Sequence, residues 1–380
     1  MAGPIEIKQF DSQNRKLIKE FIMIPWTLKI YDNDSSWIPP IIHEQKKFFH
    51  HDKGYFFEVG EAAFFIAYRN GKPVGRITAH VNSLYEKKYD THTGFFGHFE
   101  SLNEKETAQA LFDAAAAWLR GKGKTTMQGP QSFSIYDAIG FEVHGENVMP
   151  VIGLFHLAGY YKDLAVACGF EKLIDWSCYL VKKIEDYKPY LKAVRDEYMK
   201  SQTDLEYSIF DKKDFPRRRQ DVLEIFNTAW EGNWGHLPLT QKQFDMLIDE
   251  LIQIVVPELV IFAEDRKTKK TIGFIISIPD VNHIFRILNG RLYPWRLLRA
   301  LMAAKKTKKL RTIIMGVLPT YRGRKIDDVF YLRTIEDGVG LGFDASDCSL
   351  IVETNFKMIG ALKPLKAENY KTYRIYQKKI

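Results

Sequence analysis

The order of predicted strands and helices repeats along the chain, and this repetition limits the fold more than any other feature. In the first half, strands are predicted over 63–68 and 74–81, and Asn70-Gly71 between them favours a tight hairpin turn because both residues tolerate positive φ. A strand over 93–99 and an Ala-rich helix over about 103–120 follow. The second half repeats this order, with strands predicted over 259–265, 271–278, 311–318, 348–353 and 371–377 and helices over 326–337 and 356–363.

The chain of 380 residues is long enough for two domains of ordinary size, and its 46% of hydrophobic residues can supply a core to each. Two copies of one α+β unit, each a mixed central sheet flanked by helices, account for the repeated order. We therefore predict an N-terminal domain over 1–185, a helical linker over 186–205 and a C-terminal domain over 206–380.

The cysteine pattern favours a reducing, cytoplasmic compartment. Cys168, Cys178 and Cys348 leave an odd thiol and have no metal-ligand spacing, so we expect no metal cofactor. The first residues lack a basic region followed by an apolar run, and no uninterrupted apolar stretch reaches about 18 residues. We expect neither a signal peptide nor a transmembrane helix.

The most specific motif is Val317-Leu-Pro-Thr-Tyr-Arg-Gly-Arg-Lys-Ile326, between a predicted strand and a predicted helix. It resembles the pyrophosphate loop of GNAT acyltransferases, in which Arg/Gln-x-x-Gly-x-Gly/Ala follows the fourth strand. There, main-chain N–H groups and the positive end of the helix dipole hold the CoA phosphates. The resemblance implies acetyl-CoA or a longer acyl-CoA as co-substrate, bound by Val317, Leu318, Tyr321, Arg322, Gly323, Arg324, Lys325 and Ile326.

This loop departs from the GNAT pattern at two positions. Counted from Arg322, the expected small residues are replaced by Lys325 and Asp327, whose side chains can obstruct the approach of the backbone to a phosphate. Two readings stay open. Arg322, Arg324 and Lys325 compensate by charge while Asp327 caps the helix, or the segment is a basic surface turn.

Further segments resemble an uncharacterised bacterial family of tandem GNAT-like proteins. Some members of that family are proposed to be lipid N-acyltransferases, including a bacterial type of ceramide synthase. The resemblance implies an N-acyltransferase that transfers an acetyl or longer acyl group to a small-molecule or lipid amine. The segments that carry it are Trp37-Ile-Pro-Pro40, Val74-Gly-Arg-Ile77, Gly94-Phe-Phe-Gly97, Gly129-Pro130, Trp230, Asn233-Trp-Gly235, Pro279-Asp-Val-Asn282, Leu288-Asn-Gly-Arg-Leu292 and Tyr370-Lys-Thr-Tyr-Arg-Ile-Tyr376.

The corresponding place in the first half lacks the features of an anion site. It contains no glycine and carries Glu100, Glu104 and Glu106. Carboxylates at the start of a helix satisfy its dipole and repel phosphate. We predict that the first half does not bind CoA and instead shapes the acceptor pocket or supports the second half.

Amide formation from a thioester needs a positioned acyl group and a base. The resemblance places the acyl group at a splayed fourth strand, here 313–318. It also matches Asn355 with the Asn that the family carries between the fifth strand and the following helix. Glu353, at the end of a predicted strand, is our first candidate base and His236 the second. The alternatives are a salt-bridged carboxylate for Glu353 and a solvent-exposed loop residue for His236. The helix over 356–362 contains no Tyr, so the general acid is unassigned.

Four aromatic residues are candidates for the substrate pocket. Trp230 and Trp234 lie in the helix-turn-helix that forms the acceptor wall in the family. In the first half, Tyr136 lies in a polar loop and Tyr160 opens the predicted helix that ends before Gly169. Ordinary aromatic packing is the alternative for all four.

The segment 283–309 is predicted to be one basic, amphipathic helical region, and from Asn282 to Arg311 no acidic residue occurs. It suits three situations: peripheral contact with the inner face of an anionic membrane, binding of a polyanion such as tRNA, or packing on its own sheet with a solvated basic face. The net charge of +8 is compatible with each. Nucleic acid is the least favoured partner.

Two other functions compete with acyl transfer. A non-catalytic acyl-CoA sensor or scaffold would explain the missing small residues and the missing Tyr. An aminoacyl-tRNA-dependent transferase also uses paired GNAT-like halves, but no inserted helical arm is seen here.

Overall fold

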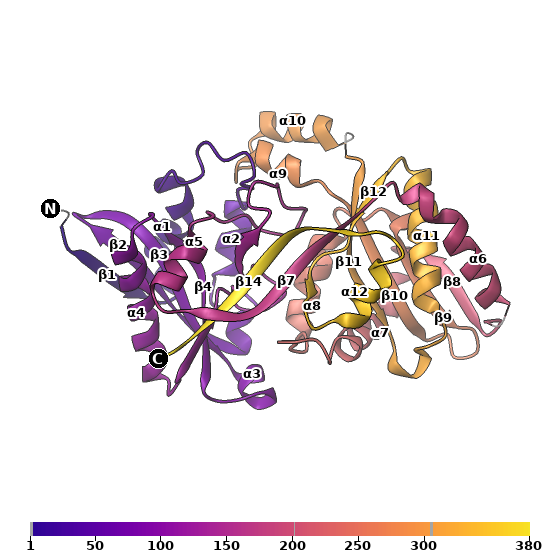
Figure 1. Cartoon of the computed structure of the whole chain (residues 1–380), viewed down its shortest axis with the longest axis horizontal. Helices are drawn as coiled ribbons and strands as arrows, with labels where there is room; N and C mark the ends of the chain where they lie inside the picture. The colour runs from indigo at the N-terminus through magenta and orange to yellow at the C-terminus, as the bar shows by residue number, and fades with distance from the viewer. Residues whose placement is uncertain (1–2, 201, 305–306) are drawn as a thin grey trace. The chain divides into compact units, whose positions relative to one another are not determined.

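A computed structural model describes residues 3–200, 202–304 and 307–380. By its internal contacts the chain forms two compact units that interleave along the sequence (Figure 1). The first unit comprises Met1–Ser177, Asn282–Ala303 and Tyr370–Ile380, and the second comprises Cys178–Val281 and Ala304–Asn369. The domain boundaries at 185 and 205 stay predictions, whereas by contacts 282–303 and 370–380 group with the first unit.

The sheet of the first unit begins with antiparallel neighbours and then changes direction. Its strands are β1 (Ile5–Phe10), β2 (Gly60–Arg69), β3 (Lys72–Asn82), β4 (Thr93–Ser101), β5 (Thr126–Gly129), β6 (Phe141–His144), the first part of β7 (Glu171–Lys182) and most of β14 (Glu368–Lys379). The β2–β3 turn has φ 51° at Asn70 and 73° at Gly71, so the predicted hairpin is confirmed. β5 runs parallel to β4 and pairs antiparallel with β14, with Gly129 opposite Tyr376.

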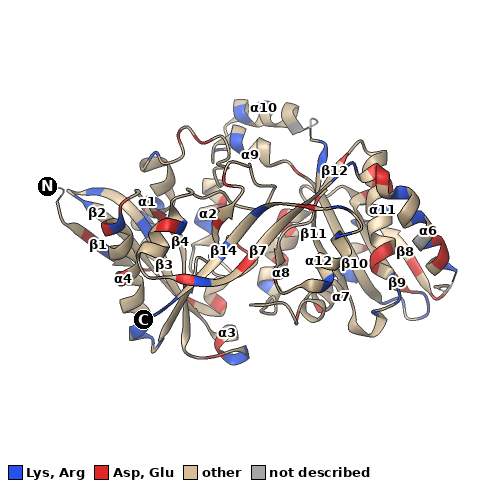
Figure 2. Cartoon of the chain, viewed as in Figure 1, with Lys and Arg blue, Asp and Glu red and all other residues tan. Residues whose placement is uncertain are grey.

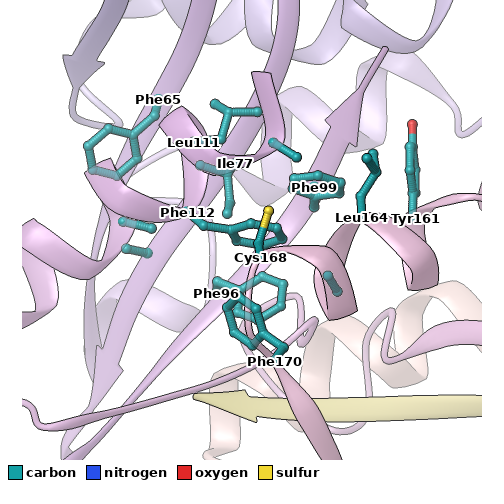
Figure 3. Packing of buried hydrophobic residues seen from close by; sticks show 14 of the residues in the cluster. Phe65, Ile77, Phe96, Phe99, Leu111, Phe112, Tyr161, Leu164, Cys168 and Phe170 are labelled. Carbon is teal, nitrogen blue, oxygen red and sulfur yellow. The ribbon is translucent and has the colours of Figure 1, made fainter. Parts of the chain in front are cut away.

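The predicted Ala-rich helix is α4 (Lys105–Gly121), which supplies the core of the first unit. Its buried positions, among them Ala108, Leu111, Phe112 and Ala115, recur every three to four residues and form one apolar face. Phe112 stacks on Phe99 of β4 with ring centroids 4.8 Å apart (Figure 3). Truncating such a residue typically costs about 3–5 kcal/mol of stability.

The other helices of the first unit are short or lie near its segment ends. They are α1 (Arg15–Thr27), α2 (Ile42–Phe48), η1 (Phe56–Glu58), α3 (Ser83–Lys88), α5 (Tyr161–Ala167), α9 (Asn282–Leu288) and α10 (Pro294–Ala304). The single basic helical region predicted over 283–309 is therefore wrong in detail. Gly290, with φ 73°, separates two helices, and β11 already begins at Lys309.

The second unit repeats the same plan. Its strands are β8 (Leu205–Ile209), β9 (Val260–Asp265), β10 (Thr271–Pro279), β11 (Lys309–Val317), β12 (Ala345–Asp347), β13 (Ile351–Val352) and the end of β7 (Glu171–Lys182). β8 to β11 are antiparallel neighbours, β12 is parallel to β11, and β7 pairs antiparallel with β12. Thus β11–α11–β12 is the same parallel crossover as β4–α4–β5, and the predicted repetition is confirmed.

The helices of the second unit complete its core. They are η2 (Ile184–Tyr187), α6 (Lys188–Met199), α7 (Phe215–Ala229), α8 (Gln241–Leu251), η3 (Pro257–Leu259), η4 (Pro319–Tyr321), α11 (Ile326–Gly340) and α12 (Phe356–Leu362). One buried cluster joins Leu191 of α6, Leu332 and Ile335 of α11, and Leu362 of α12. This packing fixes the start of α11, where the predicted phosphate loop ends.

Each half of the sequence gives its last strand to the other half's sheet. β14, at the C-terminus, pairs with β5 of the first half, and β7, from the first half, pairs with β12 of the second. The pairing pattern is therefore an exchange of terminal strands.

Candidate functional site

Two parallel strands of the second unit, β11 and β12, separate beside the predicted phosphate loop. β11 pairs with β12 from Lys309 to Arg311, where β12 reaches its end at Asp347. On its other side, β11 stays paired with β10 as far as Val317, which lies opposite Gly273. The stretch 312–317 thus extends past β12, and this is the splayed strand that the resemblance implied.

Trp230 lies against this stretch of β11. It follows the last residue of α7, and its indole N–H donates a hydrogen bond to the Met315 carbonyl at 3.0 Å. Its ring stacks on Phe226, with centroids 5.2 Å apart. Trp230 is half-buried, so one part of the ring supports the strand while another part reaches solvent.

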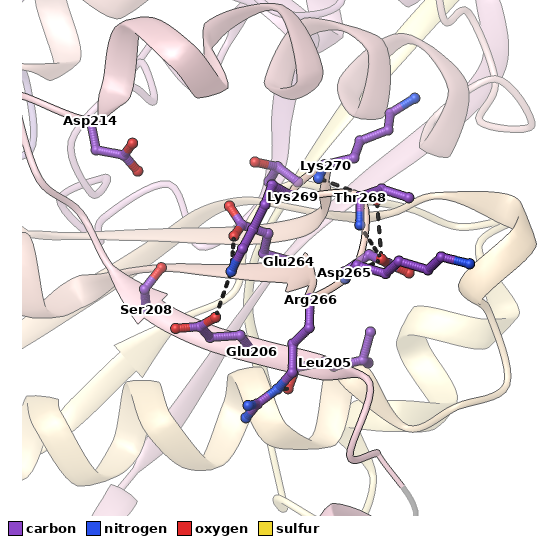
Figure 4. Close-up of polar contacts among 12 residues, drawn as sticks. Leu205, Glu206, Ser208, Asp214, Glu264, Asp265, Arg266, Thr268, Lys269 and Lys270 are labelled. Atoms are coloured by element: carbon purple, nitrogen blue, oxygen red, sulfur yellow. Dashed lines mark hydrogen bonds and ion pairs between the residues drawn. The ribbon is translucent and has the colours of Figure 1, made fainter.

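The loop after β11 is tied to the β9–β10 turn. Leu318 N–H donates to the Ile272 carbonyl at 2.9 Å, and Tyr321 donates its phenol proton to Asp265 at 2.9 Å. Asp265 also accepts the main-chain N–H of Thr268 at 2.9 Å, which closes its own turn (Figure 4). These contacts hold the pKa of Asp265 below its usual value, the Thr268 N–H being the largest cause.

Lys325 stands at a glycine position of the GNAT pattern and adopts a backbone conformation that favours glycine. Its φ is 60°, in the left-handed region, and it forms the N-cap of α11. A non-glycine residue pays about 1–2 kcal/mol for this conformation. Its ammonium turns toward Asp328, 3.5 Å away, and lies 5.7 Å from the Tyr198 ring centroid. The loop therefore keeps a glycine-type turn in spite of the substitution.

The cations of the loop are engaged by protein groups. Arg324 makes a two-pronged ion pair with Asp204 at 2.6 and 3.0 Å, and Arg322 donates to the Ala229 carbonyl at 3.0 Å. Together with Asp327 and Asp328 in the first turn of α11, Asp204 balances the three basic residues of the loop. The excess positive charge expected from the sequence is thereby reduced, although exposed ion pairs exchange readily with other anions.

Asn355 connects α12 with the turn after α7. Its side-chain oxygen accepts the Met358 N–H at 3.1 Å and caps α12, and its amide donates to the Asn233 side chain at 3.2 Å. Glu353 lies two residues earlier, half-buried in the turn after β13. Asn233 was not predicted as a site residue, although it stands in one of the family-like segments.

His236 is buried, with 1% of its surface exposed, so the alternative of a solvent-exposed loop histidine is wrong. Its Nε2 lies 3.1 Å from the Asn227 carbonyl and must carry the proton, since a carbonyl only accepts. Asn227 in turn accepts the Leu239 N–H at 2.8 Å. These contacts fix the turn that carries Trp230 and the half-buried Trp234. They favour a positioning role for His236, and its catalytic role stays a prediction.

A phenol reaches α12 from a neighbouring helix. Tyr331 of α11 donates to the Met358 sulfur at 3.6 Å, and burial raises its pKa well above the usual value, so it stays protonated. The family pattern places the acid within 356–362, so the sequence analysis did not predict Tyr331, which lies in α11. No sequence signal pairs α11 with α12 at this position.

The end of α7 and the turn after it therefore contact β11, the predicted phosphate loop and the cap of α12. Trp230 reaches β11, Arg322 reaches the last carbonyl of α7, and Asn355 reaches Asn233. The protein YghO of Escherichia coli (strain K12) is 30% identical to this chain over 375 residues, which are 97% of this chain and 94% of YghO. The chain belongs to the YghO family.

Two further proteins are similar to this chain over nearly its whole length. The bacterial ceramide synthase of Caulobacter vibrioides is 28% identical over 388 residues, covering 98% of this chain and all of that protein. A tandem GNAT protein from the clavulanic acid biosynthesis pathway superposes with a TM-score of 0.56 over 99% of this chain and 98% of its own, at 9% identity. This YghO-family chain thus has the tandem GNAT fold, as the resemblance implied. No protein-family model matches it.

The first unit of this YghO-family chain shows a different arrangement at the matching helix start. Arg69 pairs with Glu104 at 2.6 Å and with Glu106 at 3.1 Å, at the beginning of α4. Glu100 is buried and accepts hydrogen bonds from Tyr31 at 2.8 Å and from Tyr161 at 2.7 Å. Burial raises its pKa. Carboxylates thus occupy the place of a phosphate, which favours the prediction that the first half binds no CoA.

The two tyrosines predicted for the substrate pocket belong to the first unit. Tyr160 donates to the Ser101 carbonyl at 2.7 Å, and burial raises its pKa to about 12. Tyr136 is half-buried, and its main-chain N–H donates to Ser134 at 3.2 Å. Their contact with a substrate stays a prediction.

One hollow of the second unit has a volume of about 540 Å³ and contains none of the predicted site residues. It is lined by Ile209, Phe210, Asp211, Lys212, Ile252, Val255 and Pro257. Since its lining includes none of the residues that the resemblance implies for acyl transfer, the separated strands remain the better candidate. Within the described residues, no three His, Cys, Asp or Glu side chains are grouped so as to hold a metal ion.

Proposed function

We propose that this protein is an acyl-CoA-dependent N-acyltransferase that acylates a lipid amine. The observation that carries the proposal is the stretch of β11 beyond Arg311, which is not paired with β12 and leads into the loop that ends at Lys325. Main-chain groups on such an edge suit a thioester and its pantetheine arm. The lipid acceptor is suggested by the relative named bacterial ceramide synthase, since a ceramide is the N-acyl derivative of a long-chain amino alcohol.

The reaction needs one proton acceptor and a stabilised carbonyl oxygen. In our proposal, the amine nitrogen attacks the thioester carbon while Glu353 accepts the proton that the nitrogen loses. The developing negative charge on the oxygen is stabilised by N–H groups of 312–317. The carbon–sulfur bond then breaks, and CoA leaves as a thiolate that takes up a proton. Tyr331 is our candidate hydrogen-bond donor to that sulfur.

The test is release of CoA thiol on mixing the purified protein with palmitoyl-CoA and a long-chain amino alcohol, with the amide identified by mass spectrometry. We expect Glu353→Gln to lower kcat by roughly 10²-fold or more, the usual contribution of a general base. Glu258→Gln, a substitution of an exposed glutamate in the same unit, is the matched control. Equal activity of wild type and Glu353→Gln would remove the base assignment.

A second candidate is a non-catalytic acyl-CoA sensor. Lys325 at a glycine position of the loop and the absence of a Tyr from α12 favour it, because both depart from the pattern of the catalytic GNAT proteins. Acyl-CoA that raises the melting temperature without thiol release, for every amine and chain length tried, would select this candidate.

A further inference from the structure

The α9–α10 hairpin is anchored to the first unit through α9. Asn282 donates to the Pro150 carbonyl at 2.6 Å, and Arg286 donates to the Ser35 carbonyl at 2.7 Å. At the other end of α9, the indole of Trp26 donates to Asn289 at 3.0 Å. α9 is therefore held by hydrogen bonds along its length.

α10 packs on α9 with one face only. Ala300 is 3% exposed, and Arg296 donates to the Leu288 carbonyl at 2.7 Å. Near the C-terminal end of α10, Nε2 of His283 donates to the Ala303 carbonyl at 3.0 Å. These three contacts fix which side of α10 points inward.

The opposite face of α10 presents large apolar side chains to solvent. Trp295 is 62% exposed, Leu298 61%, Leu301 68% and Met302 60%. Positions i, i+3, i+6 and i+7 lie on one face of a helix, so the four side chains form one continuous surface. Leu292, just before the helix, is 51% exposed and extends it. We call Leu292, Trp295, Leu298, Leu301 and Met302 the α10 face.

The surroundings of the α10 face are cationic. Arg291 and Arg299 are exposed beside it, and Figure 2 shows Arg but no Asp or Glu on α9 and α10. The sequence has no acidic residue from Asn282 to Arg311. Tyr293 and Trp295 stack with centroids 4.8 Å apart, and amphipathic rings of this kind are enriched where lipid head groups meet acyl chains. Lys305 and Lys306, in the segment predicted to contact a membrane, lie outside the described residues.

We propose that the α10 face inserts into the interfacial layer of an anionic lipid bilayer. An apolar helix face bordered by cations complements a surface that is apolar inside and negatively charged at its head groups. A nucleic acid is a poorer match, because the most exposed side chains are apolar and cannot contact phosphate. Within the described residues no helix combines the length and hydropathy needed to cross a bilayer, so the predicted mode is attachment along the surface.

The inference goes beyond the proposed reaction and does not depend on it. A membrane-bound protein of any catalytic activity would show the same binding. If the proposed reaction is also correct, attachment would place the enzyme where its lipid amine is found.

The test is co-sedimentation of the full chain with vesicles of phosphatidylcholine alone and with about one third phosphatidylglycerol, a fraction that gives a strongly negative surface. We expect binding to the anionic vesicles and at least a roughly tenfold loss of partitioning in Trp295→Glu/Leu298→Glu/Leu301→Glu. Arg299→Glu should weaken binding to anionic vesicles and leave the weak binding to phosphatidylcholine unchanged.

The matched control replaces three exposed apolar residues elsewhere, Val148→Glu/Val166→Glu/Leu341→Glu, and adds the same charge. These residues are 42%, 59% and 46% exposed. Equal binding by the two triple variants would overturn the proposal, as would absence of wild-type binding. A lipid-free dimer that only the α10 variant dissociates would instead assign the face to a second copy of the chain. Thiol release with a water-soluble amine, unchanged in the α10 variant, separates failure of attachment from failure of the reaction.

Discussion

The indole N–H of Trp230 donates a hydrogen bond to the main-chain carbonyl of Met315 at 3.0 Å. This contact joins the end of α7 to the part of β11 that extends past β12. A side chain from the proposed acceptor wall thus touches the strand on which the thioester is proposed to lie. Small movements of this wall would be transmitted directly to the acyl group.

Trp230→Phe keeps the aromatic packing but removes the hydrogen bond. We expect a loss of about 0.5–1.5 kcal/mol in the free energy of unfolding, measured by urea titration, because one hydrogen bond is lost. The KM for acyl-CoA should rise as well, since β11 loses its support. Trp118→Phe, a substitution on α4 in the first unit, should leave that KM unchanged. A Trp230→Phe enzyme with normal KM would show that the contact serves stability alone.

Lys325→Gly tests whether a side chain obstructs the phosphate loop. Glycine adopts φ 60° without strain, so the free energy of unfolding should change by less than about 1 kcal/mol, the relief being offset by a more flexible unfolded chain. Affinity for acyl-CoA, measured by calorimetry, should increase. Lys269→Gly is a close control, because Lys269 also has a positive φ of 58° but lies in the β9–β10 turn. Equal affinity changes in both variants would exclude a local effect at the loop.

Asp204→Asn frees Arg324 from its ion pair. We expect acyl-CoA affinity to rise roughly twofold to fivefold at low ionic strength, the range of a single exposed charge interaction. The gain in affinity should be smaller in 0.5 M salt, where the Debye screening length is only about 4 Å. Arg322→Glu/Arg324→Glu should abolish binding. Unchanged affinity in this double variant would remove the phosphate-loop assignment.

His156 is predicted to make stability depend on pH. Its Nε2 lies 2.7 Å from Asp34 and its Nδ1 2.9 Å from Glu142, which also pairs with buried Lys371 at 2.5 Å. Burial alone would lower the pKa of His156, but the two carboxylates outweigh it and raise the pKa above the usual 6.5. Because the pKa of His156 is raised in the folded state, its protonated ring stabilises the fold fully below pH 6.5. This contribution is lost as the pH rises through the folded-state pKa.

The melting temperature should therefore fall as the pH is raised from about 6 to 9, and His156→Gln should flatten that part of the profile. His51→Gln, at an exposed position, should keep the wild-type slope. An unchanged slope in His156→Gln would assign the pH dependence to another group.

The repeated α+β plan was predictable because it depends on local signals, such as the Asn70-Gly71 turn and the apolar face of α4. The pairing partner of each strand could not be predicted, because the pattern of apolar residues in a strand indicates which face is buried but not which strand lies beside it. The same limit applies to the site. The type of loop could be predicted from the sequence of Val317 to Ile326, because the motif is local. The ion pair of Arg324 with Asp204 could not, because it joins residues 120 positions apart. Only the fold could reveal that the basic charge of the loop is balanced.

The exchange of β7 and β14 has a consequence for synthesis on the ribosome. The sheet of the first unit needs Tyr376 and its neighbours beside β5, and these residues are translated long after β5 itself. The N-terminal half must therefore wait, with the edge of β5 uncovered, until β14 has left the exit tunnel. During that interval the nascent protein is most exposed to misassembly and to chaperones.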